Sequence, residues 1–138
     1  MFIENIKLVN FRNIKYTELT PHNKINFIMG SNAQGKTNFI EAIYLAAFLK
    51  SFRTQKNSDL IKEGEKELLV ELNINKYFVK NSIKLSISKD KKIISVDNKK
   101  INNNKNYFKN INVIIFHPDE VNYIGSYPVF RRNLIDRS

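Results

Sequence analysis

The first part of the chain carries apolar residues in a pattern that predicts two β-strands. Residues 2–9 are expected to form the first strand, and residues 14–19 the second. Residues 10–13 are expected to form a turn between them. Pro21 and Asn23 end the second strand, because proline and asparagine favour turns.

A regular alternation of apolar and polar residues returns after residue 67 and again predicts strands. One strand is expected over residues 68–74, and a half-buried strand with one face toward water over residues 83–88. Residues 93–96 and 99–101 flank the dipeptide at 97–98, a pattern that predicts a hairpin with a tight turn. These antiparallel strands are expected to form a secondary sheet beside the core of the domain.

The pattern is different between these two regions. The segment over residues 24–29 is short and mostly apolar, which favours a buried strand. Residues 38–49 are apolar nearly all round, which is typical of a buried helix. Residues 50–58 are polar and basic, and a loop is expected there. Strand, loop and helix would therefore follow one another across this stretch.

The last part of the chain mixes polar and apolar segments. Residues 102–106 are a polar connector of low complexity. Residues 113–116 are continuously apolar, and a fully buried strand is predicted over residues 112–116. A helix is expected over residues 127–136, with Pro128 near its first turn.

Between the predicted strand and the predicted helix, residues 30–37 match the phosphate-loop pattern G-x-x-x-x-G-K-[ST]. In such a loop, backbone N–H groups surround phosphate oxygens, and the start of the following helix attracts the anion. Lys36 would reach the β- and γ-phosphates, and the Thr37 hydroxyl would bind Mg²⁺. The alternative is an ordinary tight turn before a helix, but the flanking elements are those that the nucleotide site requires.

Composition limits the class of protein. A chain of 138 residues suits one domain with one core, and 42% hydrophobic with 26% charged residues is typical of a soluble globular protein. No apolar run is long enough to span a membrane, and the N-terminus does not resemble a secretory signal. The absence of cysteine excludes disulfides and thiolate metal sites. A cytoplasmic protein of bacterial type fits these features.

The net charge of +10 has two interpretations. One is binding to a polyanion such as nucleic acid. The other is a compositional habit, since Asn, Ile and Lys are over-used and only five of the 23 basic residues are Arg, as in proteins from A/T-rich genomes. The charge by itself leaves both interpretations open.

A phosphate-loop ATPase also needs an acidic motif that follows an apolar strand and holds Mg²⁺. The nearest match is residues 113–120, in which His117 and Pro118 separate the apolar run from Asp119 and Glu120. That spacing moves the carboxylates away from the end of the strand, which favours a simple turn. An Asn-Lys-x-Asp segment, which reads guanine in small GTPases, is absent from the sequence.

Several blocks together resemble a known family. Residues 6–13 resemble the first strand and turn of SMC-like ATPase heads. Residues 30–45 and the basic residues 51–54 are similar to RecF recombination proteins in particular, and so is the stretch from His117 to Asp136. The resemblance runs from residue 3 to the end of the chain. It implies an α/β fold: a partial P-loop NTPase, the N-terminal lobe of an ABC-type ATPase head, with an antiparallel β subsheet and a buried helix after the loop.

The resemblance also implies a domain division and a nucleotide site. Residues 1–138 would be the N-terminal part of the ATPase head, and residues 126–138 would begin a helical second domain. ATP with Mg²⁺ would be the cofactor, with Thr37 as the metal ligand. The residues expected to hold the nucleotide are Arg12, Gly30, Ser31, Asn32, Ala33, Gln34, Gly35, Lys36, Thr37 and Asn38.

For function, the resemblance implies a cytoplasmic DNA-binding protein of DNA replication, DNA damage repair and the SOS response, which helps to load recombinase at single-stranded gaps. Its implied partners are gapped DNA and single-strand/double-strand junctions, RecR- and RecO-type mediator proteins, and a second copy in an ATP-dependent homodimer. Candidate DNA contacts are Arg53, Lys56, Lys99 and Lys100. No membrane is expected as a partner.

Family members are more than twice as long as this chain, and their signature and acidic motifs lie in the C-terminal part. The chain is therefore expected to be an N-terminal portion that does not hydrolyse ATP alone, and no catalytic residue is assigned. Two alternatives stay open. One is a folded fragment without catalysis, and the other is a different SMC-like ATPase head.

Overall fold

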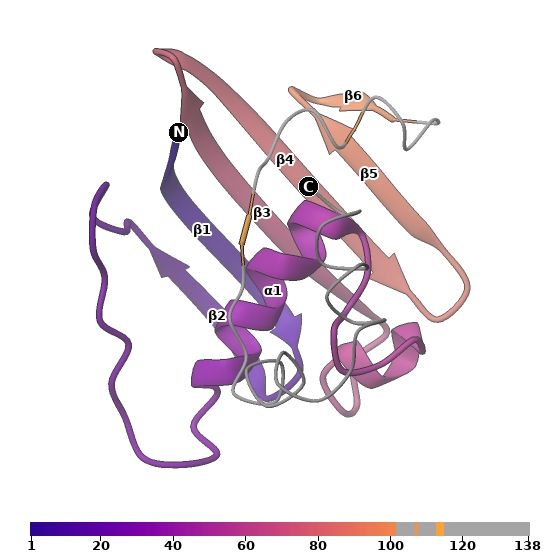
Figure 1. Cartoon of the computed structure of the whole chain (residues 1–138). Coiled ribbons are helices and arrows are strands. Elements are labelled where there is room, and N and C mark those ends of the chain that lie inside the picture. Colours follow the sequence, from indigo (N-terminus) through magenta and orange to yellow (C-terminus); the bar gives the residue numbers. More distant parts are fainter. Residues whose placement is uncertain (102–106, 108–112, 115–138) are drawn as a thin grey trace, which may run out of the picture.

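The computed structural model describes residues 1–101, 107, 113 and 114. These residues form one sheet and two helical elements (Figure 1). In chain order the elements are β1 (Phe2–Phe11), β2 (Ile14–Leu19), α1 (Lys36–Phe48), the 3-10 helix η1 (Asn57–Leu60), β3 (Glu67–Lys76), β4 (Val79–Ser88), β5 (Lys92–Val96) and β6 (Lys99–Lys100).

The six strands form a single sheet in the order β2-β1-β3-β4-β5-β6, and every neighbouring pair is antiparallel. The strands that the alternation predicted are confirmed, including the tight hairpin around residues 97–98. One expectation changes. The two N-terminal strands belong to the same sheet as the later strands, because β1 pairs with β3 along most of its length.

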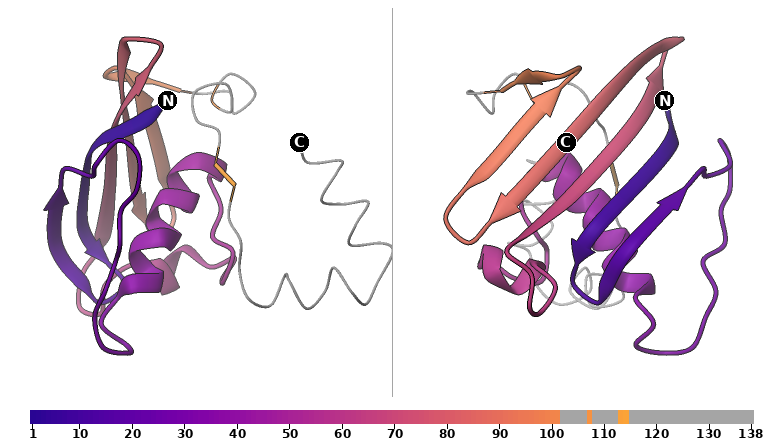
Figure 2. Two further views of the ribbon diagram at one scale, coloured as in Figure 1. Left: turned by 60° about the vertical axis from the view of Figure 1, so that its left-hand side comes forward. Right: turned by 180° about the vertical axis from the view of Figure 1, so that it is seen from behind.

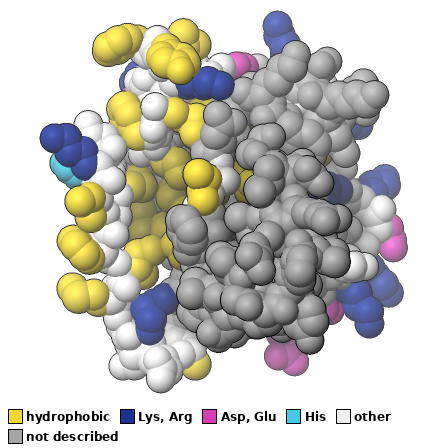
Figure 3. All heavy atoms as spheres, in the orientation of Figure 1, with side chains coloured by type: hydrophobic (Ala, Val, Ile, Leu, Met, Phe, Trp, Pro, Cys, Tyr) yellow, Lys and Arg dark blue, Asp and Glu magenta, His cyan; other side chains and the backbone are white. Residues whose placement is uncertain are grey.

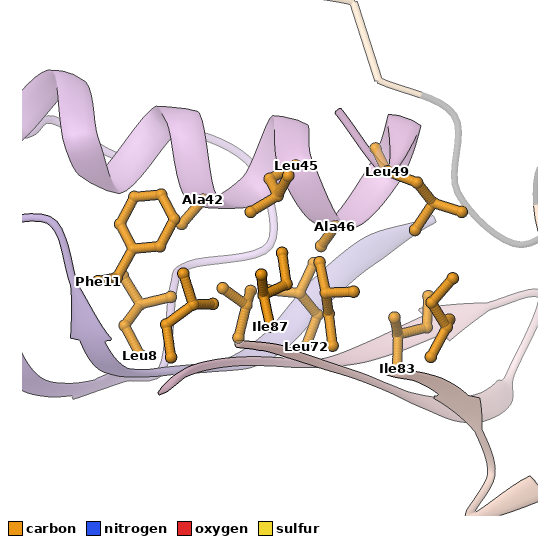
Figure 4. Packing of buried hydrophobic residues seen from close by; sticks show 14 of the residues in the cluster. Leu8, Phe11, Ala42, Leu45, Ala46, Leu49, Leu72, Ile83 and Ile87 are labelled. Carbon is orange, nitrogen blue, oxygen red and sulfur yellow. The ribbon is translucent and has the colours of Figure 1, made fainter. Parts of the chain in front are cut away.

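One face of this sheet carries the hydrophobic core. Alternate residues of β1, β3 and β4 are buried on that face, as the period of two in the sequence requires. Helix α1 lies across the same face. Figure 4 shows Ala42, Leu45 and Ala46 of α1 pointing toward Leu72 and the other apolar side chains of the sheet. The core therefore fixes α1, and with it the loop before α1, against the sheet.

Figure 2 shows that α1 lies on one side of the sheet only.

The strand register places charged residues opposite one another on four neighbouring strands, β2, β1, β3 and β4. In this order they are Glu18, Lys7, Glu71 and Lys84. Opposite charges thus alternate from strand to strand, which favours this register, since unlike charges on facing residues attract each other.

Helix α1 spans Lys36–Phe48, close to the predicted range. Its sequence is apolar nearly all round, yet only one side is fully buried, and Ile40 is exposed. Leu49, with a left-handed φ of 57°, caps the end of the helix, and its backbone N–H donates to the Leu45 carbonyl. Lys92 of β5 donates to the Leu49 carbonyl at 2.7 Å, and partial burial lowers the pKa of this lysine.

The strand predicted over residues 24–29 is wrong, since this segment has no regular secondary structure. Its apolar side chains are exposed, with Phe27 at 84%. Figure 3 shows hydrophobic side chains along this segment at the left-hand edge of the molecule. The physical reason is that a strand needs a partner, and none of the described strands pairs with these residues.

Predictions for the last part of the chain fall mostly outside the described residues. The connector over 102–106 and the helix over 127–136 lie outside them, as does the start of a second domain at 126–138. Of the predicted strand over 112–116, Val113 packs partly against the core, whereas Ile114 is 83% exposed and in no strand. Full burial of that run is therefore wrong at Ile114.

Candidate functional site

The phosphate loop, residues 30–37, connects the exposed segment to the first turn of α1 (Figure 1). The ammonium group of Lys36 turns back over the loop and donates to the carbonyl oxygens of Gly30 and Ser31, at 2.6 and 2.7 Å. These two bonds close the loop into a ring. The loop is therefore curved, and the Lys36 ammonium group bonds to carbonyl oxygens at its start.

The start of α1 is suited to an anion. Phe39 makes the first backbone hydrogen bond of the helix, to the Gly35 carbonyl. No side chain caps this end, and its first turn contains no acidic residue. The first N–H groups of a helix have no partner within the helix, and they lie at the positive end of its dipole. An anion at the loop would meet these N–H groups together with the exposed Thr37.

Gly35 is required by the local geometry. Its φ of 100° is in the left-handed region, where side chains are strained. A Cβ atom at this position would also lie 2.9 Å from Oδ1 of Asn13. The loop thus approaches the β1–β2 turn too closely for any other residue to fit without movement.

Asn13 links the β1–β2 turn to both sides of the loop. Its amide nitrogen donates to the Ala33 carbonyl at 3.2 Å, and its amide oxygen accepts from the side chain of Asn38 at 2.8 Å. One side chain of the β1–β2 turn therefore contacts the middle of the loop and the first turn of α1. These two hydrogen bonds attach the curved loop to the β1–β2 turn at the end of the sheet.

Directly behind the loop, Glu41 of α1 is completely buried and accepts hydrogen bonds from three side chains. Arg12 donates to both of its oxygens, at 3.1 and 2.7 Å, and Ser51 donates to Oε1 at 2.5 Å. Arg53 donates to Oε2 at 3.3 Å. A buried carboxylate is stable only when its oxygens are paired, and here they are. We call Arg12, Glu41, Ser51 and Arg53 the Glu41 network.

The Glu41 network reaches Asn38, in the first turn of α1, on one side and the basic loop of residues 50–58 on the other. Arg53 also donates to the side-chain oxygen of Asn38 at 2.7 Å. Arg12 donates to the backbone carbonyl of Asp59 at 2.7 Å. The Asp59 carboxylate accepts from the Thr54 hydroxyl, and this bond holds its pKa below the usual value. Hydrogen bonds thus connect residues 51–59 to the N-terminal half of α1.

The structure places the sequence-predicted residues in separate groups. The predicted nucleotide residues from 30 to 38 lie together, and Arg12 lies behind them, bonded to Glu41. Arg53 joins the same group through Asn38. Lys99 and Lys100 are on the edge strand β6, at the opposite end of the sheet from η1 and the adjacent Lys56 (Figures 1 and 2). The four candidate DNA contacts therefore do not form one patch.

Sequence reasoning missed the roles of Glu41 and Asn13. The signal for Glu41 was available: it is a lone acid in an otherwise apolar helix, and a buried acid needs partners. Asn13 has no such signal, because its role depends on the distance between a turn and a loop 20 residues later.

Two absences apply to the described part of the chain. Among residues 1–101, 107, 113 and 114, no three His, Asp or Glu side chains come together as a metal site. Within the same residues, no helix is both long and apolar enough to cross a bilayer.

The sequence model of the family described as RecF/RecN/SMC N terminal domain matches residues 2–121, and the chain belongs to this family. Within the family it is similar to RecF. It is 38% identical over 138 residues to the DNA replication and repair protein RecF of Geotalea uraniireducens (strain Rf4), and 36% identical over 137 residues to that of Clostridioides difficile (strain 630). The chain spans 38% and 37% of the lengths of these relatives.

Solved structures show the same similarity. The chain matches a structure described as the recombination mediator protein RecF-ATP in the RecFOR pathway, with a TM-score of 0.85 and 31% identity, over 99% of this chain and 38% of the other. A structure from a study of ATP-driven dimerization and DNA-stimulated activation of SMC ATPases has a TM-score of 0.82 at 21% identity, which shows the shared fold. The resemblance expected from the sequence is confirmed.

Proposed function

We propose that this chain is the nucleotide-binding N-terminal part of a RecF-type DNA replication and repair ATPase, and that it binds ATP with Mg²⁺ at the phosphate loop. The observation that carries the proposal is the closed curve of the loop at the uncapped start of α1. A solved relative of the same fold is described as RecF-ATP, which supports the choice of nucleotide.

Each part of the loop would have a separate task. Backbone N–H groups of residues 31–36 would surround the phosphates, and Lys36 would exchange its bonds to the loop carbonyls for bonds to phosphate oxygens. The Thr37 hydroxyl would complete the coordination of Mg²⁺. Asn13 and Asn38 would keep the loop curved while the ligand enters. Arg12 has three of its nitrogens engaged by Glu41 and Asp59, so any phosphate contact would use its remaining N–H groups.

Calorimetric titration with ATP and Mg²⁺ tests this proposal. Wild type should bind ATP, and Lys36→Ala should lose measurable binding. Among the described residues, Lys36 is the only side-chain cation bonded to the loop carbonyls, and this substitution removes it. Lys24→Ala is the matched control, since Lys24 is an exposed lysine shortly before the loop, and its variant should bind as wild type does. Equal binding by Lys36→Ala and wild type would mean that the loop is not the nucleotide site.

The proposal includes DNA binding, with gapped DNA as the expected substrate in the cytoplasmic response to DNA damage. The relatives are named as DNA replication and repair proteins, and of the two interpretations of the net charge of +10 this supports the polyanion. Arg53, Lys56, Lys99 and Lys100 are the proposed phosphate contacts. If they bind phosphates, raising the salt concentration should weaken DNA binding steeply, because counterions compete. An affinity independent of salt would contradict these contacts.

A RecF-type protein would work with RecR- and RecO-type mediators and as an ATP-dependent dimer. Solved relatives are described as part of the RecFOR pathway and as showing ATP-driven dimerization, which supports this part of the proposal. Because the chain spans 38% of its relatives, these partners would engage the larger protein.

A second candidate is a folded part without ATP hydrolysis of its own. The exposed apolar side chains of residues 25–29 favour it, because no strand among the described residues pairs with this segment. A phosphate-release assay on this chain with saturating ATP should then give the rate of the Lys36→Ala variant. Gel filtration should show self-association through the apolar segment. Hydrolysis above the variant's rate would contradict this candidate.

A further inference from the structure

The tip of the β3–β4 hairpin exposes two adjacent aromatic side chains. Tyr77 and Phe78 form the two-residue turn between the paired residues Lys76 and Val79, and they are 85% and 99% exposed. Figure 1 shows this turn at the far end of the longest hairpin, and Figure 3 shows hydrophobic side chains with basic ones beside them at the same end. Packing within the described residues does not account for either ring.

The backbone of this turn makes the choice of residues more unusual. Tyr77 and Phe78 have φ values of 53° and 65°, in the left-handed region. A two-residue hairpin turn with this backbone favours Asn and Gly, and a bulky side chain there is strained. The β5–β6 turn has the same geometry, with φ values of 50° and 62°, and uses Asp97 and Asn98. The aromatic pair is therefore costly for folding and calls for another explanation.

The surroundings of the aromatic tip are basic. Lys76 and Lys80 flank the turn, and the β5–β6 turn lies at the same end of the sheet, where Asp97 donates its N–H to the Ser82 carbonyl of β4. That second turn leads directly into β6, which consists of two exposed lysines. Two acids lie nearby. Glu4 pairs with Lys80 at 3.2 Å, so these two charges offset each other, and Asp97 accepts from Asn81 and Ser82. The positive charge of this end therefore comes from Lys76, Lys99 and Lys100.

We infer that the Tyr77-Phe78 tip is a stacking surface for unpaired bases of single-stranded DNA, with the neighbouring lysines on its phosphates. The inference rests on the proposed DNA binding and specifies which DNA this end of the sheet takes. Every base presents a flat face that stacks on an aromatic ring, and lysines beside the ring follow the backbone. Bases in a duplex are already stacked on one another, so the tip would prefer unpaired bases to a duplex.

The test is fluorescence anisotropy with a labelled oligothymidylate of about 20 nucleotides and a blunt duplex of the same length. The variant is Tyr77→Asn combined with Phe78→Gly. It removes both rings and introduces the pair that this turn geometry favours, so the hairpin should remain folded. Single-strand affinity should fall at least about tenfold, since each stacked base contributes strongly. Duplex affinity should stay within about twofold, since the lysines are retained.

Phe27→Asn is the matched control, because Phe27 is an equally exposed aromatic residue away from the hairpin, and both affinities should be unchanged. An unchanged single-strand affinity in the hairpin variant would overturn the inference, and the tip would then fit a protein partner. An equal loss on both DNAs would also overturn it. Failure of the wild type to bind any DNA would overturn the inference and the proposed DNA binding together, whereas the ATP titration stands apart from both.

Discussion

Arg12 and Glu41, which lie 29 residues apart in the sequence, are joined by a two-point ion pair with N···O distances of 3.1 and 2.7 Å. Glu41 is completely buried, and the Arg12 side chain is 18% exposed. The pair connects the β1–β2 turn to α1 directly behind the phosphate loop. It is therefore a structural link between the sheet and the helix that begins at the proposed nucleotide site.

Breaking this ion pair should destabilise the fold far more than breaking its neighbour. Arg12→Ala leaves Glu41 buried with one strong partner fewer, and we expect a loss of about 3 kcal/mol in the free energy of unfolding. Arg53→Ala should cost less than about 1 kcal/mol, because the Arg53 side chain is 45% exposed and its interaction is screened by water. Urea denaturation measures both values. Equal losses for the two variants would contradict the central role of Arg12.

Replacing Gly35 should destabilise the protein in two ways, through backbone strain and through a steric clash with Asn13. Gly35→Ala adds a Cβ at a φ of 100° and within 2.9 Å of Asn13 Oδ1. Gly64→Ala is the control, because Gly64 also has a positive φ of 83° but has no atom within 4 Å of the added Cβ. We expect Gly64→Ala to lower the free energy of unfolding by about 1 kcal/mol through backbone strain alone, and Gly35→Ala to lower it by more.

In an Asn13→Ala background, the cost of Gly35→Ala should fall toward that of Gly64→Ala, because the close contact is then gone while the backbone strain stays. Thermal denaturation of the four proteins of this cycle measures the coupling. Fully additive losses would mean that Asn13 and residue 35 do not contact each other.

The charge pattern on the uncovered face of the sheet should contribute to the choice of register. Glu71→Lys places a positive charge between Lys7 and Lys84, which face residue 71 from both neighbouring strands. Like charges on facing residues repel, so we expect a loss of about 1 kcal/mol that shrinks at high salt. Glu67→Lys is the control, since residue 67 faces Ser88. A salt-independent loss in Glu71→Lys would point to packing instead of charge.

Asp97 should make the stability of the protein depend on pH in the acidic range. The backbone N–H of Ser82 and then the Asn81 side chain hold its pKa below the ordinary value of 3.8. The unfolded chain therefore takes up a proton first as the pH falls. The stabilisation is present above about pH 4 and is lost as the pH falls through the lowered folded pKa.

Asp97→Asn removes this titration while keeping a residue that suits the turn. Its unfolding free energy should change less with pH between about 4 and 2 than that of wild type, as measured by urea denaturation at each pH. Parallel curves for the two proteins would show that the Asp97 carboxylate does not contribute.

The sequence by itself determined much of this protein. Alternating residues in β1, β3 and β4 have a single way to bury their apolar side chains, so the strands follow from the pattern. The phosphate-loop motif is equally local, because eight adjacent residues contain both the glycines and the lysine. Such features depend on near neighbours in the chain and are visible without a structure.

Only the tertiary structure decided the rest, because those features depend on residues that are distant in the chain. Residues 24–29 have the composition of a strand but no described strand beside them, and pairing is what makes a strand. Glu41 is a partner of Arg12 and Asn13 is a neighbour of Gly35 only after β1 and α1 have packed together. The sheet brings these groups within hydrogen-bond distance, and no local pattern records that approach.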